Sequence, residues 1–549
     1  MKSNNKHIGI LIIIIFVLPI LSINLSVSNI GSVQELEHQS FFETLKSSST
    51  YNNTLLIDDD NPLFDWANRS AEGICTGSGT SGDPYEISND IFDTSSGVIG
   101  LYIRDSRKHF KIVNCDFISA IVEAIFLFNT SNGIIEDNQM TGFNYGIDVN
   151  NCTDITFRNN NCSLGGIGFL IQNSYDLSLI SNDVNRNTAH GFDLDDVDDS
   201  LFESNTVNEN DGNGFVVLTC NSNIFRDNTI QNNSGNGIGL GTSNFNRLES
   251  NTVNLNSIGI YLASSSSFNI LSQNTANNNQ YQGIYLTNNC DNNTVSECTA
   301  NHNGDEGIRF NNCDDSVVSK STAYNNTGHG IRVNSGVNVS SIDNDVYNNR
   351  GVGIRYFGVD DSRIENNNVH HNGEYGIRVF SSSVRNYITG NIANFNNLSG
   401  IVLQSNSDDN ILYQNTASNN MEHGIFLETA DLNLISSNTA NANEINGIHL
   451  YVSDNNVISS NIANNNNNGT YLDSSDNNKI LGNNLLNNGD CYNETGSVDN
   501  LFEDNICTAP ALPTPGLDPF ILGMIIGLAI GFGALAAVII ISFLRGRKK

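Results

Sequence analysis

A short pattern recurs along most of the chain at nearly constant spacing, and it constrains the fold more than any other feature. The pattern is a glycine, an apolar residue, a variable residue and a second apolar residue, as in Gly330-Ile331-Arg332-Val333. Successive copies are 22 to 24 residues apart, and weaker copies at Gly100 and Ala124 bring the total to about 17 turns. Clear copies begin at Gly146, Gly168, Gly191, Gly214, Gly237, Gly259, Gly283, Gly307, Gly330, Gly353, Gly376, Gly400, Gly424, Gly447 and Gly469.

The alternation of apolar and variable residues in each copy has a period of two, which predicts a short β-strand with one buried face. Each repeat holds two or three such segments, separated by the turn formers Asn, Ser, Asp and Gly. We expect the repeat glycine to supply a backbone position that tolerates positive φ. A unit this short cannot bury its apolar face alone, so the repeats must stack into a solenoid.

An asparagine occurs eight or nine residues before most repeat glycines, as at Asn182, Asn205 and Asn228. We expect it to point inward at one bend of every coil. Its amide can bond both the backbone and the asparagine of the next coil, about 4.8 Å away. The sequence therefore predicts one asparagine ladder that satisfies polar groups buried at a bend.

The glycine and asparagine pattern resembles that of the right-handed parallel β-helix repeat family, which includes NosD-like proteins, pectate lyases, polygalacturonases and mannuronan epimerases. The resemblance covers about residues 96–485. It implies an all-β fold, a right-handed parallel β-helix solenoid with caps at both ends. It does not imply one function, because this fold carries lyases, hydrolases, epimerases, adhesins and non-catalytic stalks.

The catalytic motifs of the family are incomplete in this chain. Mannuronan epimerases carry Tyr-Gly-Phe-Asp-Pro-His, of which residues 145–150 keep Tyr145, Gly146 and Asp148 but lack the histidine. Residues 190–196 keep the aspartate but lack the proline and the histidine that follow it. The polygalacturonase set of Asn-Thr-Asp, a paired aspartate and Arg-Ile-Lys is not found, so the sequence assigns no catalytic residue.

The two ends of the chain predict secretion and membrane anchoring. Residues 1–28 resemble a signal peptide or an uncleaved anchor, because two lysines precede a short apolar run. Residues 520–544 carry no charge and predict a transmembrane helix, and the basic tail 545–549 predicts a cytoplasmic end. The solenoid is thus expected outside the cell, at the cell surface. The other expected segments are a disordered linker at 29–50, an N-terminal cap at 51–95, the repeats at 96–485, a C-terminal cap at 486–508 and a Pro-rich spacer at 509–519.

Charge and loop composition exclude two classes of partner. A net charge of −33 argues against nucleic acid. The glycine-rich stretch at residues 77–85 is not followed by a helical pattern, so we expect no nucleotide site.

Four consecutive repeats carry an arginine at the variable position, and stacking aligns these residues in one row outside the core. Neighbouring like charges about 4.8 Å apart repel by about 1 kcal/mol in water, so the row needs acidic partners. Asp305, Glu306 and Glu374 lie just before the same strands and can supply them internally. The alternative is an acidic polysaccharide or glycoprotein glycan, whose carboxylates or sulfates match the guanidinium group and whose rings can stack on aromatic residues. The candidate ligand-binding residues are Arg309, Arg332, Arg355, Arg378, Tyr261, Tyr285, His329, Tyr356, Glu374 and Phe426.

Cysteine positions suggest two disulfides outside the cell. Cys290 and Cys313 hold similar places in adjacent repeats and should stack at about 5 Å. Cys491 and Cys507 flank the end of the repeats and can close a cap.

Paired aspartates recur at one turn, and stacked carboxylates are candidates for a calcium site, although Asp is also an ordinary turn former. Copper is not supported, because the chain has four methionines and its histidines are scattered in sequence. The candidate calcium residues are Asp314, Asp315, Asp360 and Asp361.

These features favour a membrane-anchored extracellular β-helix protein that binds a linear, acidic polysaccharide along one sheet. Two alternatives stay open: a polysaccharide lyase or epimerase that uses the same row, and a structural stalk or adhesin without catalysis.

Overall fold

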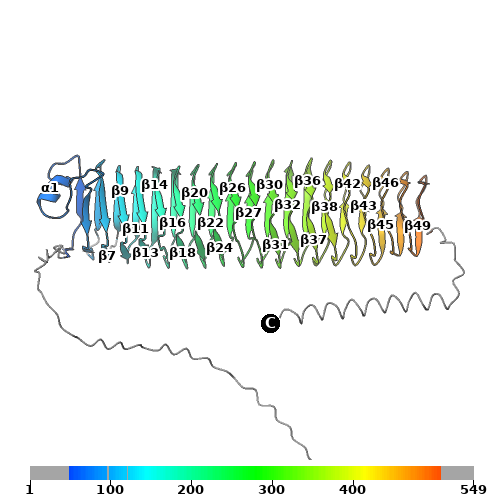
Figure 1. Ribbon diagram of the computed structural model, residues 1–549, viewed down its shortest axis with the longest axis horizontal. Coiled ribbons are helices and arrows are strands. Elements are labelled where there is room, and N and C mark those ends of the chain that lie inside the picture. Colours follow the sequence, from blue (N-terminus) through cyan, green and yellow to red (C-terminus); the bar gives the residue numbers. More distant parts are fainter. Residues whose placement is uncertain (1–47, 96–97, 120–121, 509–549) are drawn as a thin grey trace, which may run out of the picture. The chain divides into compact units, whose positions relative to one another are not determined.

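The computed structural model describes residues 48–95, 98–119 and 122–508. They form a parallel β-solenoid of about 18 turns, in which strands stack coil upon coil along one long axis (Figure 1). The predicted all-β solenoid is confirmed. Each coil contributes to three parallel ladders, which we call the first, second and third ladder in the order in which the chain meets them after the repeat glycine.

The first ladder contains the strands that begin at or next to the repeat glycine. They are β2 (Leu55–Asp58), β5 (Leu101–Arg104), β8 (Glu123–Phe128), β11 (Tyr145–Asn150), β14 (Ile167–Tyr175), β16 (Phe192–Asp198), β19 (Phe215–Leu218), β22 (Ile238–Gly241), β25 (Ile260–Ala263), β27 (Ile284–Thr287), β29 (Ile308–Asn311), β32 (Ile331–Val337), β35 (Ile354–Asp360), β38 (Ile377–Phe380), β41 (Ile401–Gln404), β43 (Ile425–Glu428), β45 (Asn446–Tyr451), β47 (Asn468–Asp473) and β49 (Asp490–Thr495).

The second ladder follows after one bend. Its strands are β3 (Tyr85–Ser88), β6 (Phe110–Val113), β9 (Ser131–Glu136), β12 (Thr153–Arg158), β15 (Ser178–Ile180), β17 (Leu201–Glu203), β20 (Ile224–Arg226), β23 (Arg247–Glu249), β26 (Ile270–Ser272), β28 (Thr294–Ser296), β30 (Val317–Ser319), β33 (Ser340–Ile342), β36 (Arg363–Glu365), β39 (Tyr387–Thr389), β42 (Ile411–Tyr413), β44 (Leu434–Ser436), β46 (Val457–Ser459), β48 (Lys479–Leu481) and β50 (Leu501–Glu503).

The third ladder is built of shorter pieces, which single bridges such as Asp183–Thr206 connect. Its strands are β1 (Thr50–Tyr51), β4 (Ile91–Asp93), β7 (Asp116–Ile118), β10 (Gln139–Thr141), β13 (Asn161–Cys162), β18 (Thr206–Asn208), β21 (Thr229–Gln231), β24 (Thr252–Asn254), β31 (Thr322–Tyr324), β34 (Asp345–Tyr347), β37 (Asn368–His370) and β40 (Ile392–Asn394).

The repeat glycine is required for close packing and not for a positive φ, so that part of the prediction is wrong. Gly330 lies outside the left-handed region, and a Cβ there would sit 2.2 Å from Val346 Cγ1, 2.7 Å from Asn349 Nδ2 and 2.8 Å from the Gly353 oxygen. The next coil therefore leaves no room for a side chain.

The predicted asparagine ladder is present at the bend between the second and third ladders. Asn344 Nδ2 donates to the Val318 oxygen (3.1 Å) and to Asn367 Oδ1 in the next coil (2.9 Å). The residue before it, Asp343, has φ of 56°. A left-handed residue turns the chain, and the asparagine that follows it satisfies the backbone groups that the turn exposes to the core.

Asparagine ladders also line the other two bends, which the sequence analysis missed. Asn326 donates to Asn349 at 2.9 Å where the third ladder leads to the first, and Asn386 donates to Asn410 at 3.1 Å between the first and second ladders. Asparagine ladders thus stabilise all three bends of the solenoid. They keep equivalent residues of successive coils in register, including those that point outward.

The expected N-terminal cap at 51–95 is one further coil with an insertion. β2, β3 and β4 pair in parallel with β5, β6 and β7. The short helix α1 (Trp66–Ala71) lies in the insertion, and its Trp66 is fully buried. The indole stacks at 5.3 Å on both Tyr85 and Phe110 and donates to Ser106 Oγ at 3.1 Å. This insertion closes the first end of the core.

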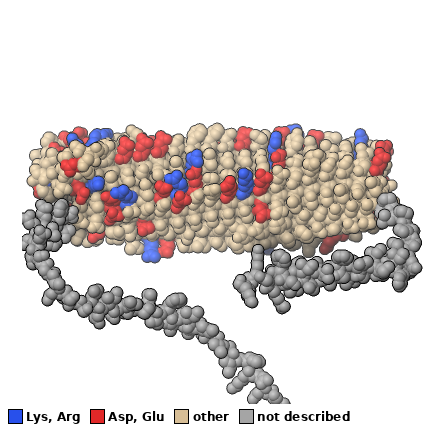
Figure 2. Space-filling view, viewed as in Figure 1, with Lys and Arg blue, Asp and Glu red and all other residues tan. Residues whose placement is uncertain are grey.

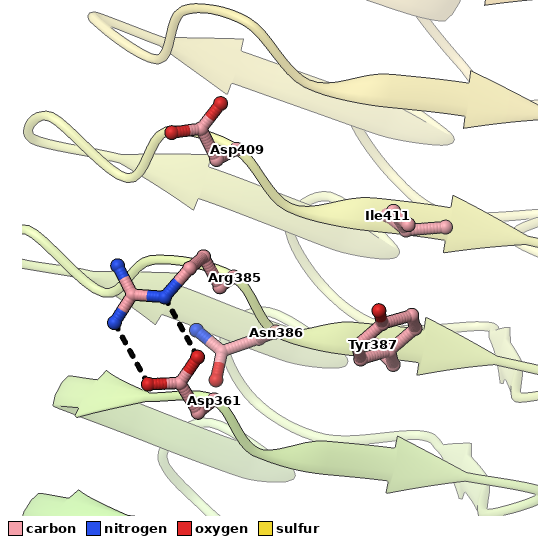
Figure 3. Close-up of a pocket in the computed structure, with 6 residues that line it drawn as sticks. All are labelled: Asp361, Arg385, Asn386, Tyr387, Asp409 and Ile411. Atoms are coloured by element: carbon pink, nitrogen blue, oxygen red, sulfur yellow. Dashed lines mark hydrogen bonds and ion pairs between the residues drawn. The ribbon is translucent and has the colours of Figure 1, made fainter.

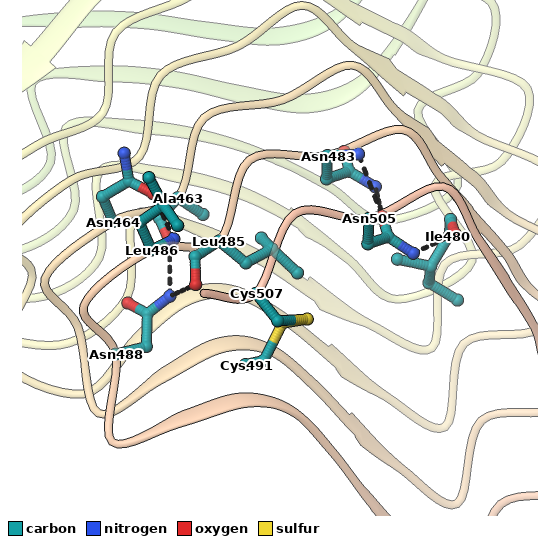
Figure 4. Close-up of a disulfide and its surroundings, with 10 residues drawn as sticks. All are labelled: Ala463, Asn464, Ile480, Asn483, Leu485, Leu486, Asn488, Cys491, Asn505 and Cys507. Carbon is teal, nitrogen blue, oxygen red and sulfur yellow. Dashed lines mark hydrogen bonds between the residues drawn. A yellow bond between two sulfur atoms is a disulfide. The ribbon is translucent and has the colours of Figure 1, made fainter. Parts of the chain in front are cut away.

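The expected C-terminal cap at 486–508 is likewise a last coil, because β49 and β50 pair with β47 and β48. Cys491 and Cys507 form a disulfide with a Cα–Cα distance of 5.3 Å, which links two segments of that coil (Figure 4). The bond joins the start of the final coil to its end. Among the described residues no further coil stacks on this one, so the disulfide holds a coil that has a neighbour on one side only.

The expected disulfide between Cys290 and Cys313 is absent, and both are free, buried thiols. Cys290 donates to the Thr287 oxygen at 2.9 Å and Cys313 to the Asn311 oxygen at 3.5 Å. Stacked residues in parallel coils project side by side, whereas a disulfide needs side chains that converge.

Among residues 48–95, 98–119 and 122–508, no helix is long and apolar enough to cross a membrane. The predicted signal peptide, spacer, transmembrane helix and basic tail, with most of the linker, fall in 1–47 and 509–549 and so lie outside the described residues.

Candidate functional site

The four arginines lie in one row on the outer face of the first ladder. Strand register pairs Arg309 with Arg332, Arg332 with Arg355, and Arg355 with Arg378, on β29, β32, β35 and β38. The predicted alignment is therefore confirmed, and we call these four residues the arginine row. On the face shown in Figure 2, charged side chains cover a minority of the surface and gather in short groups along the solenoid.

A second outward row runs beside the arginine row. It contains the residue directly before each repeat glycine, and in the two examples that follow this residue contacts the arginine-row position of the next coil. Arg332 reaches Glu306 in this way, and His449 reaches His423, both across 26 residues of sequence. We call this arrangement a cross-coil pair. An arginine of the row has an acidic cross-coil partner only where the residue before the preceding repeat glycine is acidic, as Glu306 is for Arg332.

Glu306 is an acidic partner within the first half of the arginine row. Its side chain is only 1% exposed, and it accepts from Arg332 Nη1 at 2.5 Å while Arg309 Nη1 lies 3.7 Å away. Gln282 Nε2 donates to the same carboxylate at 3.0 Å. Asp305, which was also expected to pair with the row, accepts from Gln282 at 2.7 Å and forms no ion pair among the described residues.

Arg355 and Arg378 form the unpaired half of the row. Within the described residues, no carboxylate oxygen lies within 4.0 Å of either guanidinium group. Their hydrogen bonds go to amide oxygens instead: Arg355 donates to Asn334 at 2.9 Å and Arg378 to Gln404 at 2.7 Å.

Aromatic rings support these two arginines. Phe380 lies 4.7 Å from the guanidinium carbon of Arg355 and 4.1 Å from that of Arg378, and Tyr375 lies 5.3 Å from Arg378. Burial, together with the charges of Arg332 and Arg378, lowers the pKa of Arg355 to about 10. The site thus holds two positive charges close together with no carboxylate within 4.0 Å of either among the described residues, and an anion would stabilise it.

The structure places three other predicted ligand-binding residues, His329, Glu374 and Tyr356, in different environments. His329 lies next to Arg355, and burial and that charge lower its pKa to about 4; its Nδ1 accepts from the Val352 amide at 2.9 Å. Glu374 is half-buried and makes no ion pair among the described residues. Tyr356 is fully buried and bonds Ser341 Oγ at 2.9 Å, so its assignment to the binding surface is wrong. Its position is the second apolar one of the repeat, which points inward.

Aromatic residues extend the same row at both ends, but stacking covers much of their ring surface. Tyr261 and Tyr285 have centroids 5.5 Å apart, and Arg309 lies over Tyr285 at 4.8 Å. Phe426 and Tyr471 stack on either side of His449 at 4.9 Å each. Phe426, His449 and Tyr471 cover one another's faces and offer a sugar less ring surface than the sequence suggested, whereas Tyr261 and Tyr285 are tilted by 44°.

A buried histidine pair follows the row, although the histidines are scattered in sequence. His449 Nδ1 lies 3.2 Å from His423 Nε2, while His423 Nδ1 and His449 Nε2 have no hydrogen-bond partner. Burial, with His449 as a second cause, lowers the pKa of His423 to about 3; burial lowers that of His449 to about 4. The pair is therefore neutral under ordinary conditions.

The aspartates considered for calcium are used in bonds between coils. Asp314 and Asp360 accept from the backbone amides of Val337 and Val384 at 2.8 and 3.0 Å. Asp315 accepts from Asn338 at 2.8 Å. Across the part of the chain that the structure describes, no group of three or more His, Cys, Asp or Glu has a geometry suited to a metal ion.

Asp361 lies in a pocket of about 220 Å³ at the bend between the first and second ladders (Figure 3). Arg385 binds both oxygens of this carboxylate at 2.7 Å. Tyr387, Asp409 and Ile411 complete the wall. Because its arginine is already neutralised, this pocket offers less to an anion than the arginine row does.

Asp148 is a titratable group on the first ladder that the sequence analysis left without a role. It is 9% exposed, and burial and the nearby Glu123 raise its pKa to about 7. Burial also raises the pKa of Glu123, whose Oε2 has no hydrogen-bond partner. Asp148 occupies the same outward row as the arginines, several coils toward the N-terminus.

Comparison with protein families matches the description "Right handed beta helix region" at residues 99–253, 246–361 and 334–485. The chain belongs to this family. The match covers the coils that carry the arginine row and confirms the resemblance and the right-handed sense of the solenoid. A comparison with curated proteins gives no match.

Several solved structures are similar at low identity. The mannuronan C-5 epimerase AlgE6 A-module of Azotobacter vinelandii is 14% identical, with 76% of this chain and 90% of that chain covered and a TM-score of 0.28. The Dettilon tailspike protein is 13% identical, with 59% and 61% covered and a TM-score of 0.34. The DFA-IIIase of Arthrobacter chlorophenolicus is 13% identical, with 66% and 84% covered and a TM-score of 0.27. At these values the likeness carries no statement about activity.

Proposed function

We propose that the protein binds a linear acidic polysaccharide, or the acidic glycan of a glycoprotein, along the outer face of the first ladder. Arg355 and Arg378 make the main contacts. The proposal includes a cell-surface location for the solenoid, with residues 520–544 as the membrane anchor that their sequence suggests.

One observation carries this proposal. Arg355 and Arg378 stand in register on neighbouring coils, are held by amide oxygens and aromatic rings, and lack a carboxylate partner within the described residues. Guanidinium groups bind carboxylates and sulfates through paired hydrogen bonds. A row that follows the solenoid axis suits a linear ligand better than a compact one.

The test compares the wild type with an Arg355→Gln/Arg378→Gln double variant. Both are measured for binding to polygalacturonate, dextran sulfate and neutral dextran over a range of salt concentrations. We expect salt-sensitive binding to one or both acidic polymers, and a loss of about tenfold or more in the double variant, since each contact involves a charged group.

A matched control is Arg226→Gln, because Arg226 lies on the second ladder and is already bound to Glu203 at 2.6 Å. This variant removes one arginine from the surface without touching the arginine row, so it should bind as the wild type does. If neither acidic polymer binds the wild type, the polysaccharide proposal fails and the structural stalk becomes the better explanation.

A second candidate function is a polysaccharide lyase or epimerase. It is favoured by Asp148, a largely buried carboxyl with a pKa of about 7 in the same row of the first ladder, because such a group can exchange a proton at neutral pH. Asp148→Asn should then abolish formation of unsaturated or epimerised products from a bound acidic polymer while leaving binding intact. Absence of product from the wild type would leave binding as the sole function.

A further inference from the structure

Glu306 holds the place that an acidic group of a ligand would occupy at the first two arginines. Its carboxylate lies between residues on two coils, 2.5 Å from Arg332 Nη1 and 3.7 Å from Arg309 Nη1. With 1% of its side chain exposed, it is buried beneath the arginines and is not a mobile side chain above them. Arg332 is therefore hydrogen-bonded to a carboxylate before any ligand arrives, and Arg309 lies within ion-pair distance of the same carboxylate.

This carboxylate stays ionised. Burial opposes its charge, but hydrogen bonds from Gln282 and Arg332 and the charges of Arg309 and Arg332 outweigh that effect and lower the pKa of Glu306. Burial and the charge of Glu306 raise the pKa of the adjacent Asp305, so that residue carries the proton of the pair first. Glu306 remains a competing anion at neutral and mildly acidic pH.

The residue directly before the repeat glycine is not acidic in the three coils that follow Glu306. These residues are His329, Val352 and Tyr375. Arg355 and Arg378 are therefore left with amide and aromatic neighbours. The boundary between arginines that face the Glu306 carboxylate at ion-pair distance and arginines that do not falls between Arg332 and Arg355.

We propose that Glu306 is an internal competitor that limits the binding footprint of the arginine row to Arg355 and Arg378. This inference rests on the proposed function. The ligand is then a glycan with two oxyanion groups, carboxylate or sulfate, at a separation that matches neighbouring coils. Longer acidic chains gain little, because the next two arginines toward the N-terminus already face the Glu306 carboxylate.

The test is Glu306→Gln, which keeps the shape of the side chain and removes its charge. Binding is measured with short and long oligomers of galacturonate and of sulfated dextran, which separate carboxylate from sulfate recognition. We expect the variant to bind long oligomers about tenfold more tightly, as one additional charge-assisted contact allows, and to show a steeper salt dependence. Short oligomers should bind both forms equally.

Two controls separate this effect from a change in folding. Glu203→Gln releases Arg226 on the second ladder and should leave binding unchanged. In the Glu306→Gln background, Arg309→Gln/Arg332→Gln should remove the gain in affinity.

Several results would overturn the inference while leaving the proposed function intact. One is a gain in affinity of the Glu306→Gln variant that survives the additional loss of Arg309 and Arg332. Another is a Glu306→Gln variant that folds normally and binds long oligomers no better than the wild type. If only the variant binds, Glu306 blocks the whole row and the proposed function fails. If neither binds, both proposals fail.

Discussion

Replacement of a repeat glycine by alanine tests whether the coils are packed as closely as the structure shows. A Cβ at Gly237 would lie 2.2 Å from Val253 Cγ1, 2.7 Å from the Gly259 oxygen and 2.9 Å from Asn256 Nδ2. The first contact can relax by movement of a side chain, but the carbonyl belongs to the backbone of the next coil. Overpacking of this kind costs about 1–3 kcal/mol, so Gly237→Ala should lower the free energy of unfolding by that amount.

Gly239 provides a control two residues further on, within β22. A Cβ there meets nothing closer than 3.8 Å, from Asn236 Nδ2 and the Phe215 oxygen, and its φ is not in the left-handed region. Gly239→Ala should leave stability unchanged or raise it by up to about 1 kcal/mol, since alanine restricts the unfolded chain. Urea unfolding of both variants, with hydrogen exchange to locate the affected coils, measures the difference. Equal stability of Gly237→Ala and the wild type would refute the close-packing argument.

Two further predictions concern burial and the last coil. The wild type should lose stability as the pH falls from about 6.5 toward 4, because the pKa of His449 is lowered to about 4 in the folded protein and protonation therefore favours the unfolded chain. The His449→Phe variant lacks this group, so its free energy of unfolding should rise relative to the wild type by on the order of 3 kcal/mol over that range. Urea unfolding at several pH values checks this, and a pH-independent difference would contradict it. Cys491→Ser should destabilise the final coil by up to about 3 kcal/mol, as expected for loss of a short disulfide loop. Hydrogen exchange should show fraying confined to β49 and β50, and unchanged protection there would count against a role for the bond.

The repeat allowed the fold and the outward row to be predicted from sequence, because both depend on a single period. Alternation within each copy separates inward from outward residues, and the period aligns Arg309 with Arg332 and the later arginines. The same logic, applied strictly, excludes Tyr356, which holds the second apolar position of its copy. Its inclusion followed residue type and ignored position.

The acidic partner of the row could be named as a candidate but not assigned. Glu306 reaches Arg332 across 26 residues, whereas the repeat here is 23 residues long, so the contact joins different positions of adjacent coils. That offset depends on how neighbouring side chains lean along the ladder, and the period alone does not contain it. Asp305 and Glu374 were equally plausible in sequence, yet neither forms an ion pair among the described residues.

The cross-coil pair suggests how one scaffold can vary the charge of its surface without changing its core, and it yields a final prediction. His329 stands to Arg355 as Glu306 stands to Arg332, 26 residues earlier in each case. His329→Glu should therefore place a carboxylate against Arg355 and lower affinity for polygalacturonate about tenfold, by the same competition that Glu306 exerts. His302→Glu adds the same charge at an exposed bend away from the row and should bind as the wild type does. The His329→Glu variant could instead fold normally and keep full affinity. In that case an acidic residue 26 positions before an arginine does not weaken ligand binding by that arginine, and Glu306 does not explain the difference between Arg332 and Arg355.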